Sequence, residues 1–141
     1  MKNLIIDLNT EHQNILMFLT KLDQSIKGSN FISKLLAMEE EIKSFTKIHL
    51  MDHHQKEERF LYLWMIEQNK NSDKELINKM IDDHKYFEQK ANWILNELVQ
   101  AKEVNYNNSV NLGFEVSDFL KRYNEHLVRE SNFIFLIAEA L

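Results

Sequence analysis

The pattern His-x-x-x-Glu occurs twice in this chain, and each copy is preceded far upstream by a single histidine. Each member of the second set lies 72 or 73 positions after its counterpart in the first. Residues four apart share one face of an α-helix, one turn apart. The pattern therefore predicts two copies of a helical hairpin that bring four imidazoles and two carboxylates together. The two sets are His12, His53 and Glu57, followed by His84, His126 and Glu130.

Four amphipathic helices are predicted, over about 7–27, 31–67, 73–102 and 110–141. Apolar residues recur in them at three- and four-residue steps, and no strand-like alternation competes. The chain has no proline and only two glycines, so little interrupts a helix. Long helices with short connectors indicate an all-α fold, an up-down-up-down four-helix bundle. The length of 141 residues indicates one domain, 1–141.

The apolar stripes predict which positions face the bundle core. In the second helix, His49, His53, Glu57, Phe60 and Trp64 follow one another on the inward stripe. The equivalent stripe of the fourth helix is Phe119, Tyr123, His126, Glu130, Phe133 and Ile137.

The charge and composition of the chain exclude several classes of function. The net charge is −5, and no cluster of lysine or arginine stands out, which argues against nucleic acid and anionic membranes as partners. The apolar stretches are too short to span a bilayer, and no signal-peptide pattern opens the chain, so a cytoplasmic location is expected. The absence of cysteine excludes disulfides and iron–sulfur ligation by the chain itself.

Glu57 and Glu130 lie on stripes that are otherwise largely apolar, where an uncompensated carboxylate is very costly. No lysine or arginine shares those stripes, so a metal is the expected compensation. Imidazole and carboxylate together suit iron, manganese and zinc. If both glutamates bridge two irons, each iron receives two imidazole nitrogens and two carboxylate oxygens. An oxide or hydroxide bridge would still leave an open position for O₂, NO, peroxide or azide.

The stretches HHQKEERFLYL and HLVRESNFIFL resemble segments of hemerythrin-like (HHE cation-binding) domains, H-x-x-x-E-E-x-x-L-F-P and H-x-x-x-E-N-x-x-L-F-P. The resemblance extends over essentially the whole chain. It implies a non-haem di-iron four-helix bundle that binds a small molecule, and it implies no particular protein partner. The metal ligands implied by the match are His12, His53, Glu57, His84, His126 and Glu130.

The chain departs from the family pattern at several positions. Leu63 and Leu136 replace the proline of the two segments, which predicts straighter helices there. The oxygen carriers have a second histidine in the third helix and an aspartate in the fourth, where this chain has Glu88 and Glu130. The ligand set instead resembles relatives that repair iron centres, sense iron or react with peroxide or NO. The repair proteins usually carry a cysteine-bearing domain, and this chain has no cysteine.

Two further histidines leave the assignment of the second helix open. His54 and Glu58 form another His-x-x-x-Glu pair, shifted by one residue, but the flanking apolar positions favour His53 and Glu57. His49 lies one turn before His53 and is expected to be a core or neighbouring residue rather than a seventh ligand.

Four other polar residues lie close to predicted ligands. Glu88 follows His84 by one turn and is expected at the boundary of the core, and Tyr123 is expected to pack in the core. Glu11 and Asp83 each precede a single histidine, and adjacent positions on a helix point in different directions. They are expected to be solvated rather than to orient a ligand.

The sequence leaves four functions open. The first is a binding or sensing module for O₂, NO or peroxide. The second is an enzyme that acts on peroxide or NO or assists repair of iron–sulfur centres, although no catalytic residue stands out beyond the ligand set. The third is an iron-responsive sensor or storage domain, and the fourth is a structural bundle with one zinc ion or none.

Overall fold

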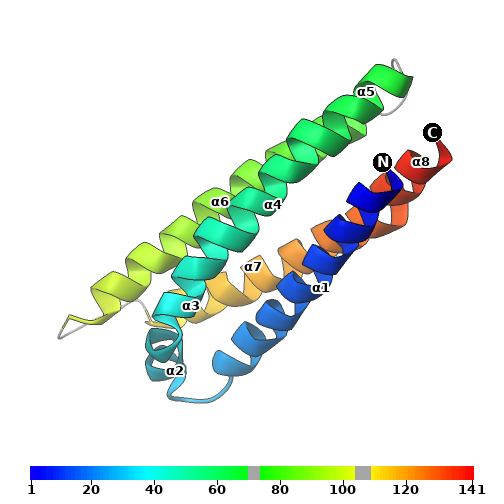
Figure 1. Cartoon of the computed structure of the whole chain (residues 1–141). Helices are drawn as coiled ribbons and strands as arrows, with labels where there is room; N and C mark the ends of the chain where they lie inside the picture. Colours follow the sequence, from blue (N-terminus) through cyan, green and yellow to red (C-terminus); the bar gives the residue numbers. More distant parts are fainter. Residues whose placement is uncertain (70–73, 104–108) are drawn as a thin grey trace.

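The computed structural model describes residues 1–69, 74–103 and 109–141, and within these ranges it is helical with no strand. Consecutive helical elements join into four rods, which Figure 1 shows lying along one another. The first rod is α1 (Lys2–Ser25) and the third is α6 (Lys74–Ala101). The second rod contains α2 (Phe31–Ala37), α3 (Glu39–Ser44), η1 (Phe45–Leu50), α4 (Met51–Lys56), η2 (Glu57–Tyr62) and α5 (Leu63–Asn69). The fourth rod contains α7 (Ser109–Arg129), η3 (Glu130–Ile134) and α8 (Phe135–Ala140).

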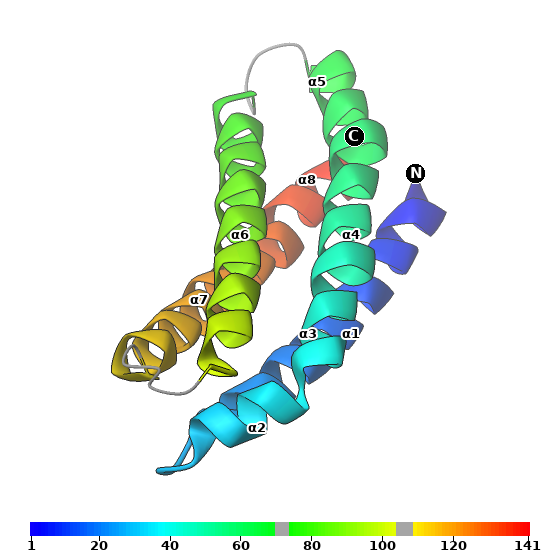
Figure 2. The ribbon, with the colours of Figure 1, turned by 90° about the vertical axis from the view of Figure 1, so that its left-hand side faces the viewer.

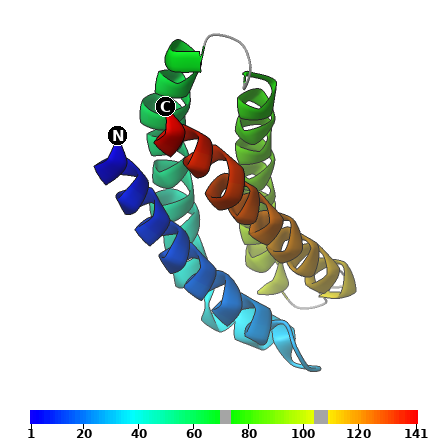
Figure 3. The same ribbon diagram turned by 90° about the vertical axis from the view of Figure 1, so that its right-hand side faces the viewer.

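The rods alternate in direction, so both termini lie at the same end of the molecule as α5 (Figures 1 and 3). The α1 rod contacts η1 on one side and α7 and α8 on the other, and α6 contacts α3, η1 and α7. The second and fourth rods therefore each lie beside both α1 and α6. One face of each of the four rods therefore lines a common centre. The structure confirms the predicted all-α bundle.

The predicted second helix is interrupted near its start, where Figure 2 shows α2 lying at an angle to α3. Met38 ends α2 with φ −98° and ψ 6°, and its N–H bonds the carbonyls of Leu35 and Leu36. The bend brings α2 against α1 and α6, so that Leu35 closes one end of the core. Gly28 makes the preceding turn with φ 95°, a conformation that favours glycine.

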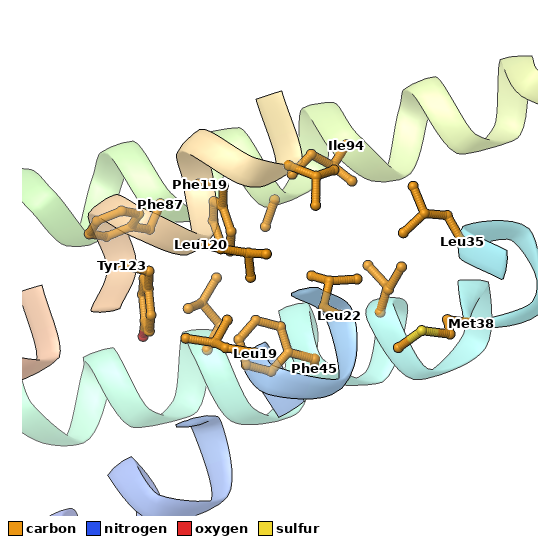
Figure 4. Packing of buried hydrophobic residues seen from close by; sticks show 14 of the residues in the cluster. Leu19, Leu22, Leu35, Met38, Phe45, Phe87, Ile94, Phe119, Leu120 and Tyr123 are labelled. Carbon is orange, nitrogen blue, oxygen red and sulfur yellow. The ribbon is translucent and has the colours of Figure 1, made fainter. Parts of the chain in front are cut away.

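Two apolar clusters fill the bundle. The larger cluster occupies the half next to α2, and Figure 4 shows it from Tyr123 to Leu35 and Met38. The smaller cluster lies near the termini and includes Ile5, Leu61 and Phe135. The apolar faces of α1 and α6 are buried, including Leu8, Leu19, Phe87 and Leu98, and so is the predicted ligand His84.

The predicted inward stripes of the second and fourth helices are wrong beyond the glutamates. Phe60 is 60 % exposed and Phe133 is 57 % exposed, while Trp64 and Ile137 are half-buried. His49 is exposed as well.

The reason is that η1, η2 and η3 are π-helical, with wider turns than an α-helix. Each wide turn rotates the following residues, so Leu61 and Tyr62 take the inward positions in η2, and Ile134 and Phe135 take them after Glu130. The helices do run on through Leu63 and Leu136, where the family pattern has proline.

Candidate metal centre

Six polar side chains lie buried between the two apolar clusters, and all four rods contribute to them. None of the six is more than 2 % exposed. Burial of so many ionisable groups is costly unless each is paired or binds a metal. The six are the residues expected from the sequence: His12 in α1, His53 in α4, Glu57 in η2, His84 in α6, His126 in α7 and Glu130 in η3.

The six residues form two overlapping groups in which the potential ligand atoms lie within 4.8 Å of one another. The first group is His12, His53, Glu57 and Glu130, and the second is His84, His126 and Glu130. Within the described part of the chain, Glu130 is the residue that both groups share. Glu57 also approaches the second group, because its Oε1 lies 3.3 Å from His84 Nε2.

The carboxylates lie at short distances from the imidazoles. Glu57 Oε1 is 3.2 Å from His53 Nε2, and Glu130 Oε1 is 2.6 Å from His126 Nε2. Two atoms that bind one metal at 2.0–2.2 Å and at right angles lie about 3 Å apart. The spacings therefore suit pairs of ligands on a common metal ion.

Among the residues that the structure describes, five atoms at the centre have no hydrogen-bond partner, although they are fully buried. They are Nε2 of His53, His84 and His126, and Oε1 of Glu57 and Glu130. Buried polar atoms in folded proteins are nearly always satisfied. A divalent cation would satisfy both the nitrogens and the oxygens, and this mixed set suits iron, manganese or zinc. The residues present therefore fit the metal centre that the sequence pattern implies.

The other nitrogen of each histidine, Nδ1, faces a polar residue from a neighbouring rod. Glu11 Oε1 lies 3.0 Å from Nδ1 of His53, and Asp83 Oδ2 lies 3.1 Å from Nδ1 of His126. The expectation that Glu11 and Asp83 are merely solvated is therefore wrong. A residue next to an inward histidine lies about 100° around its helix, so it reaches toward the adjacent rod.

The same arrangement continues around the bundle. Glu58 Oε2 lies 2.8 Å from Nδ1 of His84, and Ser131 Oγ lies 3.2 Å from Nδ1 of His12. With Nδ1 engaged in this way, Nε2 of each histidine is oriented toward the centre, as is usual for metal-binding histidines. Sequence reasoning gave neither residue this role. The sequence feature that could have identified them is that each directly follows a predicted glutamate ligand.

Two basic residues extend this arrangement to the surface. Lys56 Nζ lies 2.5 Å from Glu11, and Arg129 lies 3.9 Å from Asp83. The hydrogen bond with His53 lowers the pKa of Glu11. Although burial opposes it, the hydrogen bond with His126 also lowers the pKa of Asp83. Both carboxylates are therefore ionised and accept the Nδ1 proton.

Replacing Asp83 by asparagine is expected to weaken metal binding about 10- to 100-fold, because His126 loses an ionised acceptor that orients it. The affinity is measured by competition with a chelator of known strength. Asp82→Asn is the matched control, because Asp82 is the exposed neighbour. Equal affinities in the two variants would contradict the orienting role.

Two histidines at the centre, His53 and His84, have strongly raised pKa values in the metal-free protein. Burial lowers the pKa of His53, but the negative charge of Glu57 and the hydrogen bond with Glu11 outweigh it and raise that pKa to about 10. Burial likewise lowers the pKa of His84, but the nearby carboxylates of Glu57 and Glu58 outweigh it and raise that pKa to about 10. Burial also disfavours an ionised Glu57, yet His53 keeps the pKa of Glu57 well below its usual range.

The metal-free protein is therefore expected to lose stability as the pH rises from about 6.5 to 10. The folded-state pKa values of His53 and His84 exceed the unfolded value of 6.5, so their contribution is complete below pH 6.5 and disappears near pH 10. The loss should amount to roughly a few kcal/mol in the free energy of unfolding. Urea denaturation in the presence of a chelator at pH 7 and pH 9.5 measures it. A free energy that stays constant or increases over this range would contradict the prediction.

His54 is buried beside the centre but lies outside both ligand groups. Its ring stacks on His84 at 3.8 Å, and its Nε2 lies 2.9 Å from the hydroxyl of Tyr123. Its Nδ1 is 3.6 Å from Glu88, which is also absent from both groups. Burial and the nearby His84 hold the pKa of His54 well below its usual range. His54 is therefore a neutral residue that lines the site.

Tyr62 is a further site residue that sequence reasoning did not identify. Its hydroxyl donates a hydrogen bond of 2.5 Å to Oε2 of Glu130. Burial and the negative charge of Glu130 raise the pKa of Tyr62 well above its usual range, so the hydroxyl keeps its proton. The wide turn of η2 turns Tyr62 inward, which a regular helical stripe does not predict.

Comparison with known proteins agrees with this geometry. The model of the family described as "Hemerythrin HHE cation binding domain" matches residues 3–136. Searches of curated proteins and of solved structures found no match. In the described ranges, no helix combines the length and hydropathy that crossing a bilayer requires.

Proposed function

The chain belongs to the hemerythrin HHE cation-binding family, and from this premise we propose that it holds two iron ions and binds or senses O₂, NO or peroxide. The observation that carries the proposal is the set of five buried, unpartnered nitrogen and oxygen atoms that face one centre. The six buried residues of the centre form two groups that share Glu130, and this division suits two metal ions rather than one. His12, His53 and Glu57 would hold one ion, and His84 and His126 would hold the other, with Glu130 between them.

The two groups are unequal, which supports an open position on one side. The first group has four residues, whereas the second has three. When iron is bound, it would supply a site at which a small molecule coordinates and exchanges electrons. The rings of Phe87, Tyr123 and the neutral His54 lie beside the histidines of the second group, and this part of its surroundings offers an uncharged surface to a small ligand.

A small pocket lies beside His53, on the side of its ring that faces away from the centre. A pocket of about 210 Å³ is lined by residues of α1, η1 and α4 and reaches His53. Glu11, His49 and Lys56 line its walls. The ion pair between Glu11 and Lys56 lies in this pocket, and the His53 ring separates it from the centre, whose six residues are at most 2 % exposed. A molecule that reaches this enclosed centre must therefore be small.

The first test is the metal content and visible spectrum of protein purified without added metal, with and without azide. We expect close to two irons per chain and oxo- or hydroxo-bridge absorption that azide shifts. Manganese at the same stoichiometry would keep the site and change the metal. Zinc, a single metal or none, without a response to azide, would contradict the proposal and leave a structural bundle.

A second measurement separates a binder from an enzyme. The iron-loaded protein is mixed with peroxide or NO and followed by stopped-flow absorption. A binder or sensor gives a stable new spectrum at one ligand per site, whereas an enzyme consumes many equivalents per chain. Multiple turnovers would replace the binding function by a peroxidase-like or NO-consuming one. An absence of any spectral change would exclude both.

A further inference from the structure

The two copies of the internal repeat differ at a pair of aromatic residues beside the centre. Tyr62 follows Glu57 by five positions, and Phe135 follows Glu130 by five. Both are buried, and both stack on a histidine of the site. Tyr62 lies on His84 with ring centroids 5.7 Å apart, and Phe135 lies on His12 at 4.9 Å. The two positions are thus equivalent in space, and they differ by one hydroxyl group.

This hydroxyl makes the two bridging carboxylates different. Tyr62 donates its hydrogen bond to Glu130 Oε2, while Glu130 Oε1 has no partner. Phe135 has no group to donate, and in the described residues no hydroxyl donates a hydrogen bond to Glu57. Glu57 contacts the imidazoles of His12, His53 and His84. Glu130 therefore accepts a hydrogen bond from a hydroxyl at one oxygen, whereas Glu57 faces imidazoles at both of its oxygens.

A hydrogen bond to an ionised carboxylate is short and strong, and it withdraws electron density from the accepting oxygen. Resonance shares this loss between the two oxygens of the carboxylate, so Glu130 Oε1, which lies 2.6 Å from His126 Nε2, is also a weaker metal ligand. The effect falls on the His84 and His126 group, which has Glu130 as its carboxylate. The His12 and His53 group also contains Glu57 and is less affected, although Glu57 Oε1 lies 3.3 Å from His84 as well.

We infer that the two metal positions fill in order, the His12–His53–Glu57 position first and the His84–His126 position second, with Tyr62 setting the difference. This inference depends on the proposed two-metal site. Changes to residues that hydrogen-bond a metal ligand typically alter metal affinity 10- to 100-fold. The protein at limiting metal therefore carries one ion, and the second ion is the exchangeable one.

The test is a Co²⁺ titration of the metal-free full-length protein, followed by calorimetry and by visible absorption. The wild-type protein should bind two ions in separate steps, with dissociation constants at least about tenfold apart. Tyr62→Phe should lower the dissociation constant of the second step, so that the ratio of the two dissociation constants falls about tenfold or more. This variant suits the site, because phenylalanine already occupies the equivalent position at Phe135.

Two further variants show which metal position each binding step belongs to. Phe135→Tyr brings a hydroxyl to the Glu57 side and should weaken the first step. His126→Ala should remove the second step and keep the first. Far-UV circular dichroism shows whether each variant folds, and the wild-type titration stands on its own if one does not.

The outcomes separate this inference from the function it rests on. Equal dissociation constants for the two ions in the wild-type protein would overturn the ordered filling, and so would a ratio of these constants that Tyr62→Phe leaves unchanged. The two-metal site would remain in both cases. Loss of the first step in His126→Ala would reverse the order. Binding of fewer than two Co²⁺ ions by the wild-type protein would instead count against the proposed function.

Discussion

Glu130→Ala is expected to leave at most one metal ion per chain, the largest loss expected from a single substitution in this protein. Within the described residues, Glu130 is common to both ligand groups, and its Oε1 lies 2.6 Å from His126 Nε2 and 3.7 Å from His12 Nε2. Its removal takes a ligand from both metal positions at once. Metal per chain, measured by elemental analysis after dialysis, gives the result directly.

Glu125→Ala is the matched control, because Glu125 lies on the same rod and is exposed. It should keep the full metal content. The free energy of unfolding without metal gives a second comparison, since removal of a buried carboxylate should be tolerated or even stabilising if the bundle is purely structural. Full metal content in Glu130→Ala would contradict the shared role of Glu130.

Removal of the metal from the loaded protein should lower its melting temperature on the order of 15–30 °C. A ligand that binds only the folded state at a thousand times its dissociation constant stabilises that state by about 4 kcal/mol, and two such ions roughly double this. For a chain of this length, each kcal/mol corresponds to about 2–4 °C. The destabilisation follows because the centre then contains five buried atoms without partners.

Differential scanning calorimetry with and without a chelator measures this shift at a fixed pH near 7. The double variant Glu57→Ala, Glu130→Ala lacks both carboxylates of the centre, so its melting temperature should not respond to the chelator. A wild-type melting temperature that also ignores the chelator would show that metal contributes nothing to the stability of the bundle.

The contacts around the ligands were the least predictable part of the site. Glu11 and Asp83 were expected in solvent, yet each faces a histidine on the next rod. A sequence shows the direction of a side chain relative to its own helix but not which rod packs beside it. Glu58 and Ser131 have their roles for the same reason.

The sequence by itself determined the helices, the repeat and the six buried residues, because the spacing of four residues and the alternation of apolar stripes are properties of a single helix. The tertiary structure alone decided the wide turns at Glu57 and Glu130, which turn Tyr62 inward and Phe60 and Phe133 outward. A π turn forms where packing between rods favours it over regular hydrogen bonding, and a regular period of 3.6 residues does not contain that information. The difference between the two ligand groups therefore becomes visible only when all four rods are packed together.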